Sequence, residues 1–281
     1  MSAHHRSYSQ INSLRNCGEA YRLERIEKVT QRPSCAAVAG KVVHSATESV
    51  DWLLHAGETD PLELRRAGIL TAQAEMAGEI AANAVGEYED LGSWKRYGRQ
   101  TQAKPHGEDI EWFSAVGIPD CISAYIAWRL ANPGLSLLDI PGFGPAIEYP
   151  FVVSVEDACL VGVQVRGYID RVFVTEDDIP YLCDLKSGQK PKTDEQLGTY
   201  RHALAAVGID VTYGGYLYGL KTGDAKLTPP INLSHWSPAK LAALYVQGDR
   251  QIELGIFIPH PGEQCQHCSV TQHCTFVQAA I

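Results

Sequence analysis

The chain has 281 residues, of which 45% are hydrophobic and 20% charged, and this ordinary globular composition excludes a disordered or collagen-like protein. Its formal net charge of −9 excludes a generally cationic nucleic-acid coat, although a local basic groove or a metal ion can still hold phosphate groups. Length alone allows one large domain or two small ones, so the domain count depends on the order of the motifs.

Neither a secretion signal nor a membrane span is expected. The opening residues, MSAHHRSYSQ, lack an apolar core, and no later segment approaches the roughly 20 apolar residues that a spanning helix needs. We therefore expect a cytoplasmic protein without a membrane partner.

Apolar periodicity predicts that the first half of the chain is mainly helical. The predicted helices cover residues 7–31 (one or two helices), 36–57, 61–90 and 119–131. Gly57 is a stop signal for the second helix, which contains His44, and Asn132-Pro133-Gly134 closes the last one.

The character of the sequence changes after the Gly/Pro-rich segment 141–145. Three runs rich in β-branched and aromatic residues have strand length, and they are followed by one helical period and another strand. These segments are residues 146–155, 159–174, 181–186, 193–208 and 211–220. An antiparallel meander followed by a helix and a strand predicts an α/β core.

Eight cysteines are distributed unevenly along the chain. Cys265, Cys268 and Cys274 fall within the ten residues CQHCSVTQHC, and the two-residue gap between the first pair lets one turn present both sulfurs to one metal centre. In a reducing compartment such a group is typical of metal binding rather than of disulfides. Cys121, Cys159 and Cys183 have apolar neighbours and are expected to be small buried hydrophobes.

Three thiolates need a fourth ligand. Cys17, in a polar helical segment near the other end of the chain, is the first candidate, and Cys35 is the reserve. His267 and His273 could instead complete a tetrahedral zinc site. The spacing alone favours neither zinc nor an iron–sulfur cluster.

A second group of candidate ligands lies in residues 167–188, GYIDRVFVTEDDIPYLCDLKSG. The acidic turn around residue 177 predicts a hairpin, and Asp170 and Asp184 are equidistant from that turn. They should therefore face each other on neighbouring strands, with Cβ atoms roughly 5 Å apart. Lys186 shares a strand face with Asp184. Paired carboxylates suit Mg²⁺ or Mn²⁺, and the lysine could orient a water molecule or stabilise charge on phosphorus.

Several further residues have both a catalytic and an ordinary interpretation. Glu148, in the strand before the hairpin, could be a third acid or a solvated side chain, and His44 could be a ligand or a partly buried histidine. Gln196 and Tyr200 share one face of the helix after the hairpin. Lys190 and Lys192 lie in the intervening loop and could contact a DNA backbone or only solvent.

Taken in order, these motifs resemble the RecB-type branch of the PD-(D/E)XK nucleases, and within it the CRISPR-associated exonucleases of the Cas-four type. The matching residues are Cys17, His44, Asp170, Asp184 with Lys186, Gln196 with Tyr200, and Cys265, Cys268 and Cys274. Asp184 stands where many relatives have glutamate. The resemblance implies a [4Fe–4S] cluster on the four cysteines, joining the chain ends. It also implies that His44, Asp170, Asp184 and the carbonyl of Leu185 bind the catalytic Mg²⁺ or Mn²⁺.

The resemblance implies a restriction-endonuclease-like α/β fold in a single domain of residues 1–281. Residues 58–140 would form a helical arch, and residues 1–31 with 259–281 an iron–sulfur module. The expected activity is metal-dependent exonucleolytic hydrolysis of DNA, with a preference for single strands or ends. Asp170, Asp184, Lys186 and Glu148 are the expected catalytic residues, and Gln196, Tyr200, Lys190 and Lys192 the expected DNA contacts.

The resemblance places such an enzyme in phage recombination and repair or in CRISPR spacer processing, with the proteins of those pathways as partners. No phosphate-binding G-x-x-x-x-G-K-[ST] loop occurs, so no nucleotide triphosphate is expected as a ligand. One alternative is a non-catalytic adaptor that binds DNA ends and carries a structural metal cluster. Another is an electron-transfer protein, although three clustered cysteines and a remote one suit a structural role better.

Overall fold

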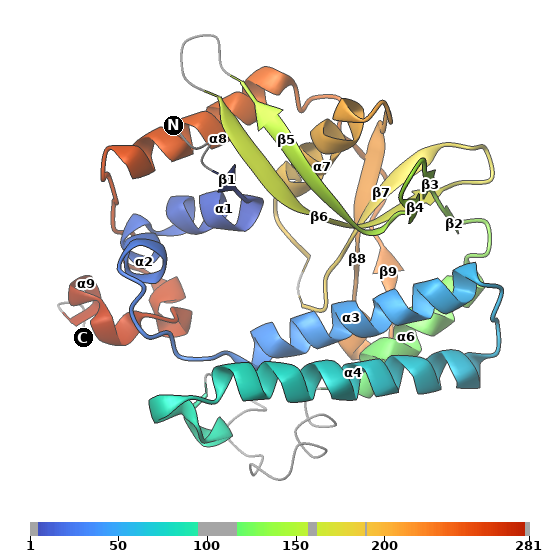
Figure 1. Cartoon of the computed structure of the whole chain (residues 1–281), viewed down its shortest axis with the longest axis horizontal. Helices are drawn as coiled ribbons and strands as arrows, with labels where there is room; N and C mark the ends of the chain where they lie inside the picture. The colour runs from blue at the N-terminus through green and yellow to red at the C-terminus, as the bar shows by residue number, and fades with distance from the viewer. Residues whose placement is uncertain (1–4, 95–116, 157–161, 189, 279–281) are drawn as a thin grey trace.

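The computed structural model describes residues 5–94, 117–156, 162–188 and 190–278. Within them, a central mixed sheet is enclosed by helices on both faces, and this confirms the α/β class (Figure 1). Cys159, residues 95–116 of the predicted arch, and residues 1–4 and 279–281 of the predicted iron–sulfur module lie outside the described residues. Among the residues described, no helix combines the length and the apolar character needed to cross a membrane.

The sheet is built around the predicted hairpin. Its main strands are β5 (Ile147–Val155), β6 (Val163–Val174), β7 (Pro180–Leu185) and β8 (Tyr213–Tyr218), and its short strands are β1 (His5–Arg6), β2 (Ser136–Leu137), β9 (Lys226–Leu227) and β10 (Ile231–Asn232). The strands β5, β6 and β7 pair antiparallel, and β8 runs parallel to β7. A separate two-stranded sheet pairs β3 (Asp139–Ile140) with β4 (Gly144–Pro145).

Two apolar clusters cover the two faces of this sheet. On one face pack α3 (Cys35–His55), α4 (Pro61–Asn83) and α6 (Ile118–Ala131), and on the other α7 (Glu195–Ala206), α8 (Pro238–Glu253) and Ile11 of α1 (Tyr8–Asn16). Because α4 and α6 are built into the core beside α3, the described helices of the segment 58–140 contribute to the main packing. An arch formed by this segment stays a prediction.

Helix boundaries follow local chemistry and correct two details of the sequence prediction. The helix predicted over 61–90 ends at Asn83 as α4, because Val85 is extended and Gly86 has a φ of 59°; two 3₁₀ turns, Gly86–Tyr88 and Leu91–Ser93, follow. Helix α8 was not predicted, although its N-cap Ser237 and the following Pro238 are a recognisable start signal.

The two ends of the chain lie side by side (Figure 1). The N-terminal part continues through α2 (Gly18–Tyr21) and a π-helical turn (Arg22–Ile26), and the C-terminal part contains two 3₁₀ turns (Glu263–His267 and Thr271–His273) and α9 (Thr275–Gln278). The Gly18 amide donates to the Ile258 carbonyl at 2.8 Å. A Cβ at Gly18 would lie 2.4 Å from the Ile258 nitrogen, so this close approach requires glycine.

Candidate active site

Three carboxylates form a row across β5, β6 and β7. The pairs Ile147↔Arg171 and Tyr149↔Ile169 place Glu148 opposite Asp170. The last pair of the hairpin, Arg171↔Cys183, puts Asp170 and Asp184 in register one step further along. The hairpin is therefore symmetric about residue 177, as the sequence predicts. Such a row concentrates negative charge at one place on the sheet and calls for a cation.

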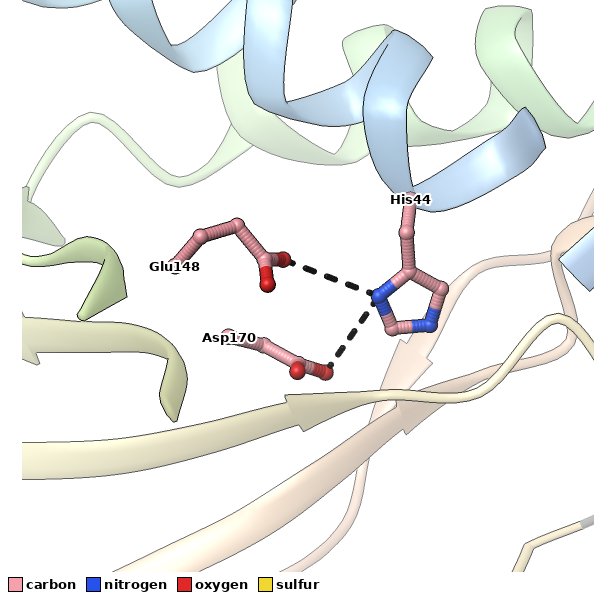
Figure 2. Close-up of side chains that lie close together, drawn as sticks. All are labelled: His44, Glu148 and Asp170. Carbon is pink, nitrogen blue, oxygen red and sulfur yellow. Dashed lines mark ion pairs between the residues drawn. The ribbon is translucent and has the colours of Figure 1, made fainter. Parts of the chain in front are cut away.

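Glu148 has a left-handed backbone conformation, with a φ of 47°. A residue with a side chain adopts this conformation at a cost of about 1–2 kcal/mol, and such strain is concentrated at functional sites. Figure 2 shows the Glu148 side chain turned toward His44, alongside the side chain of Asp170. The sequence offered no signal for this conformation, because glutamate is not a residue type that favours it.

His44 of α3 faces two of the carboxylates (Figure 2). Its Nδ1 atom lies 3.7 Å from Glu148 Oε1 and 3.7 Å from Asp170 Oδ2. One ligand atom from each of these three residues lies within 4.8 Å of the others, which is a spacing that can surround one metal ion. Burial would lower the pKa of His44, but Asp170 and Glu148 outweigh it and raise that pKa. Conversely, His44 and Arg171 lower the pKa of Glu148 against the opposing effect of burial.

Asp184 is fully buried and lies beside this group of three. Its Oδ1 has no hydrogen-bond partner within the described part of the chain, and its Oδ2 lies 2.5 Å from Nζ of Lys186, which is its counter-charge. Burial and the neighbouring Asp170 raise the pKa of Asp184 to about 7, against the opposing effect of Lys186. A buried carboxylate with an unpaired oxygen is costly, and it is the kind of group that a divalent cation satisfies.

The amide of Leu185 holds Asp170 in place. It donates a hydrogen bond of 2.7 Å to Asp170 Oδ2, so the carboxylate of one strand is fixed by the backbone of the next. The Leu185 side chain is buried in the apolar cluster under α3. A role for the Leu185 carbonyl as a metal ligand stays a prediction.

Lys186 continues into a chain of hydrogen bonds on α7. Its ammonium donates to Gln196 Oε1 at 3.2 Å, and Gln196 Nε2 donates to the Tyr200 hydroxyl at 2.6 Å. Tyr200 is buried, with its ring edge-on to Phe151, so little of the ring face is open to a nucleic-acid base. Gln196 and Tyr200 therefore fix the position of the lysine.

Lys190 and Lys192 lie in the loop between β7 and α7. Both are exposed, and neither makes an ion pair within the described ranges. The structure thus places two unpaired cations in the segment that directly follows Lys186, which is compatible with the predicted backbone contacts.

A buried charge network that the sequence analysis missed supports Glu148. Arg171 Nη1 donates to Glu148 Oε1 at 3.2 Å and to the carbonyl oxygen of Asp170 at 2.5 Å, while Nε donates to Asp51. Asp51 of α3 is fully buried and also pairs with Arg129 Nε at 2.8 Å. The available signal was an aspartate on the apolar stripe of a helix together with an arginine within a buried strand.

The four cysteines of the predicted cluster line one cavity, although they come from opposite ends of the chain. The His260 amide donates to Cys17 Sγ at 3.4 Å, and the Gly262 amide donates to Cys265 Sγ at 3.3 Å. Cys35, the reserve ligand, is the first residue of α3 and is buried in the apolar cluster of that helix instead. Cys121 and Cys183 are buried in the same apolar cluster, which confirms that they are hydrophobic core residues.

Comparison with known proteins agrees with this geometry. The model of the PD-(D/E)XK nuclease superfamily matches residues 5–275. The chain is also similar to the Gene 69 protein of Mycobacterium phage D29, with 32% identity over 96% of each chain, and to the Gene 69 protein of Mycobacterium phage L5, with 30% identity over 96% of this chain and 95% of the relative. The chain belongs to the PD-(D/E)XK nuclease superfamily, whose members are generally metal-dependent nucleases.

Proposed function

We propose that the protein is a metal-dependent deoxyribonuclease that degrades DNA from its ends and prefers single strands. The observation that carries this proposal is the row of Glu148, Asp170 and Asp184, with Lys186 beside it and His44 above it. The superfamily membership supports the hydrolysis of phosphodiester bonds. The exonucleolytic mode and the single-strand preference rest on the resemblance to RecB-type enzymes.

The residues present fit a divalent cation such as Mg²⁺ or Mn²⁺. His44, Glu148 and Asp170 are grouped closely enough to share one ion, and the buried Oδ1 of Asp184 lacks a donor within the described residues. Carboxylates are hard oxygen ligands of the kind these ions prefer. A cation held there would lower the pKa of a water molecule and offset the negative charge of the phosphate.

The side chains around this site have distinct tasks in the proposed reaction. Lys186 orients the attacking water or stabilises the negative charge that develops on the phosphate oxygens, because its ammonium is anchored by both Asp184 and Gln196. Tyr200 holds Gln196 in turn. Lys190 and Lys192 contact the DNA backbone further from the scissile bond.

We infer that Cys17, Cys265, Cys268 and Cys274 bind a [4Fe–4S] cluster, as in the Cas-four-type branch of the RecB-like nucleases. Two observations support this assignment: all four cysteines line one cavity, and backbone amides donate to the sulfurs of Cys17 and Cys265. Hydrogen bonds to sulfur are common around iron–sulfur centres. The cluster would then join residues 1–31 to residues 259–281 in one module of a single nuclease domain.

The two similar proteins come from mycobacteriophages, and this supports phage recombination and repair over CRISPR spacer processing as the setting. In either setting the enzyme works in the cytoplasm on ends that other proteins expose.

Digestion of end-labelled DNA tests the proposal. Anaerobically purified protein should release short products from a 5′- or 3′-labelled single strand in Mg²⁺ or Mn²⁺, with less activity on a blunt duplex and none in EDTA. A circular single strand should resist cleavage if the enzyme requires ends. Binding to DNA ends without hydrolysis in either metal would instead support the adaptor function.

A further inference from the structure

A groove with a volume of about 1140 Å³ lies next to the proposed metal site. It follows one face of β5 and β6 beside α1, and its lining includes Lys186, Gln196 and Tyr200 as well as the four cysteines. Part of this volume would hold the proposed cluster, and the remainder, along β5, β6 and α1, is available to a second ligand.

Strand β6 leads along this groove to the metal site. Arg166, Tyr168 and Asp170 are alternate residues of the strand and therefore share one face. Arg166 and Tyr168 line the groove, and Asp170 belongs to the carboxylate row. Each step of two residues advances about 7 Å along a strand, which is similar to the step between phosphates of an extended single strand.

Tyr168 is an unusual aromatic residue for this position. It is 62% exposed, whereas Phe151 on the neighbouring strand and Phe173 on its own strand are buried. An exposed ring on a groove wall offers a face on which a base can stack. Stacking of this kind favours an unpaired base, because the base faces in a duplex are covered by their neighbours.

The side chains that line the groove lack the acidic character of the whole chain. The chain has 33 acidic residues, yet none of the described residues that line the groove is aspartate or glutamate. Arg166 has no ion-pair partner in the part of the chain that the structure describes. A second cavity contains part of the proposed metal site; its charged or titratable lining residues are Lys41, His44, Glu48, Glu75, Glu79 and Glu148. A polyanion in the groove therefore meets no acidic side chain among the described lining residues, and it meets the acidic residues of the second cavity only at the metal site, where a bound cation would offset their charge.

We propose that this groove binds an extended single strand of DNA, in which Tyr168 stacks on a base and Arg166 contacts a phosphate, and that it guides the strand toward Asp170. The inference rests on the proposed function, because the strand in the groove is the substrate of that reaction. Ser9, Asn12 and Asn16 of α1 also line the groove, and their neutral polar side chains can donate further hydrogen bonds to phosphates.

Fluorescence anisotropy tests the groove independently of hydrolysis. The full chain is purified anaerobically, and its binding to a labelled 15-nucleotide oligo-dT is measured in EDTA, which prevents cleavage. Tyr168→Ala should weaken binding roughly 5- to 100-fold, as expected for one lost base stack, and Tyr168→Phe should bind within about twofold of the parent. Arg166→Ala should reduce the slope of log K against log salt by about 0.7, the contribution of one phosphate of a single strand.

Two matched variants control for exposure and charge. Trp52 of α3 is an exposed aromatic residue and Arg66 of α4 is an exposed arginine, and both lie outside the groove lining. Trp52→Ala and Arg66→Ala should bind oligo-dT as the parent does. Blunt duplex DNA should bind more weakly than oligo-dT, and its binding should not depend on Tyr168.

The experiments distinguish an error in the proposed role of the groove from an error in the proposed nuclease function. Suppose that the parent binds oligo-dT and that the Tyr168→Ala and Arg166→Ala variants bind it as tightly as the parent. The proposed role of the groove is then contradicted, whether or not the protein cleaves DNA. If loss of Tyr168 weakens blunt duplex and single strand equally, the single-strand assignment is overturned. Binding that depends on Tyr168 in a protein that hydrolyses no DNA in Mn²⁺ supports the groove and contradicts the nuclease function.

Discussion

Lys186 Nζ lies 2.5 Å from Oδ2 of the fully buried Asp184, and this ion pair balances a carboxylate whose Oδ1 has no hydrogen-bond donor within the described chain. The same ammonium donates to Gln196 on α7. One lysine thus links the carboxylate row on the sheet to the helix that follows it. The position of the Lys186 ammonium between Asp184 and Gln196 accounts both for its proposed catalytic role and for its role in charge balance.

Replacing Asp184 should stabilise the metal-free protein at alkaline pH. The pKa of the folded-state carboxyl is raised to about 7, above roughly 3.9 in an unfolded chain. Between these values the folded state retains a proton that the unfolded state has lost, so this group's contribution to the free energy of unfolding falls as pH rises from about 4 to 7. Asp184→Asn removes this decrease in the free energy of unfolding, which amounts to at most about 4 kcal/mol.

Denaturation in urea with EDTA, at pH 5 and pH 8, measures this effect. The increase in the free energy of unfolding caused by Asp184→Asn should be larger at pH 8 than at pH 5. The increase is reduced at both pH values because Lys186 loses its ionic partner. Asp177→Asn, in the exposed turn of the hairpin, is the matched control and should show no such pH dependence. Equal or lower stability of Asp184→Asn at pH 8 would show that the ionised carboxylate is well accommodated without metal.

Arg171 should be essential for stability. Arg171→Met leaves Asp51 buried with Arg129 as its remaining cationic partner, and removal of one member of a buried ion pair costs about 3–5 kcal/mol. Urea denaturation of this variant should show a loss in that range, while Arg66→Met on the surface of α4 should stay within about 0.5 kcal/mol of the parent. A loss below about 1 kcal/mol for Arg171→Met would mean that the network contributes little to folding.

The cysteine assignment predicts a coloured protein whose chain ends are cross-linked. Closing a loop of about 250 residues stabilises a fold by roughly 4–5 kcal/mol in loop-entropy models. Cys268→Ala should therefore lose both the brown colour and much of the thermal stability, whereas Cys121→Ala, which changes a buried core cysteine, should keep the colour. Absorbance and iron analysis under anaerobic conditions measure this. Colourless parent protein with one equivalent of zinc would contradict the cluster and leave the nuclease site unaffected.

Tyr200 should act through its hydroxyl group. Tyr200→Phe removes the acceptor of the Gln196 hydrogen bond while leaving the ring packed against Phe151, so the loss of stability should be about 0.5–1.5 kcal/mol. If the hydroxyl positions Lys186 through Gln196, kcat for DNA cleavage should fall several-fold with little change in KM, and Gln196→Ala should behave alike. A rise in KM alone would indicate direct contact with DNA.

Regular patterns made the core of the site predictable. The equal spacing of Asp170 and Asp184 from residue 177 fixed the hairpin register, and the cysteine spacing drew attention to two distant segments that the fold brings together. The Arg171–Asp51 network and the left-handed Glu148 were not predictable, because each depends on tertiary contacts between α3, β5 and β6. The burial of Asp184 likewise depends on how the helices close over the sheet.

The central claim is that one metal site, built from the carboxylate row and Lys186, hydrolyses DNA. The most direct measurement is the rate of cleavage of an end-labelled single strand as Mn²⁺ is titrated into the EDTA-treated parent, Asp170→Asn and Lys186→Ala, with the fold of each verified by circular dichroism. The parent should show saturable activation by Mn²⁺, and both folded variants should show essentially none. Cleavage by the parent that is independent of Mn²⁺, or parent-like activity in both variants, would contradict the account.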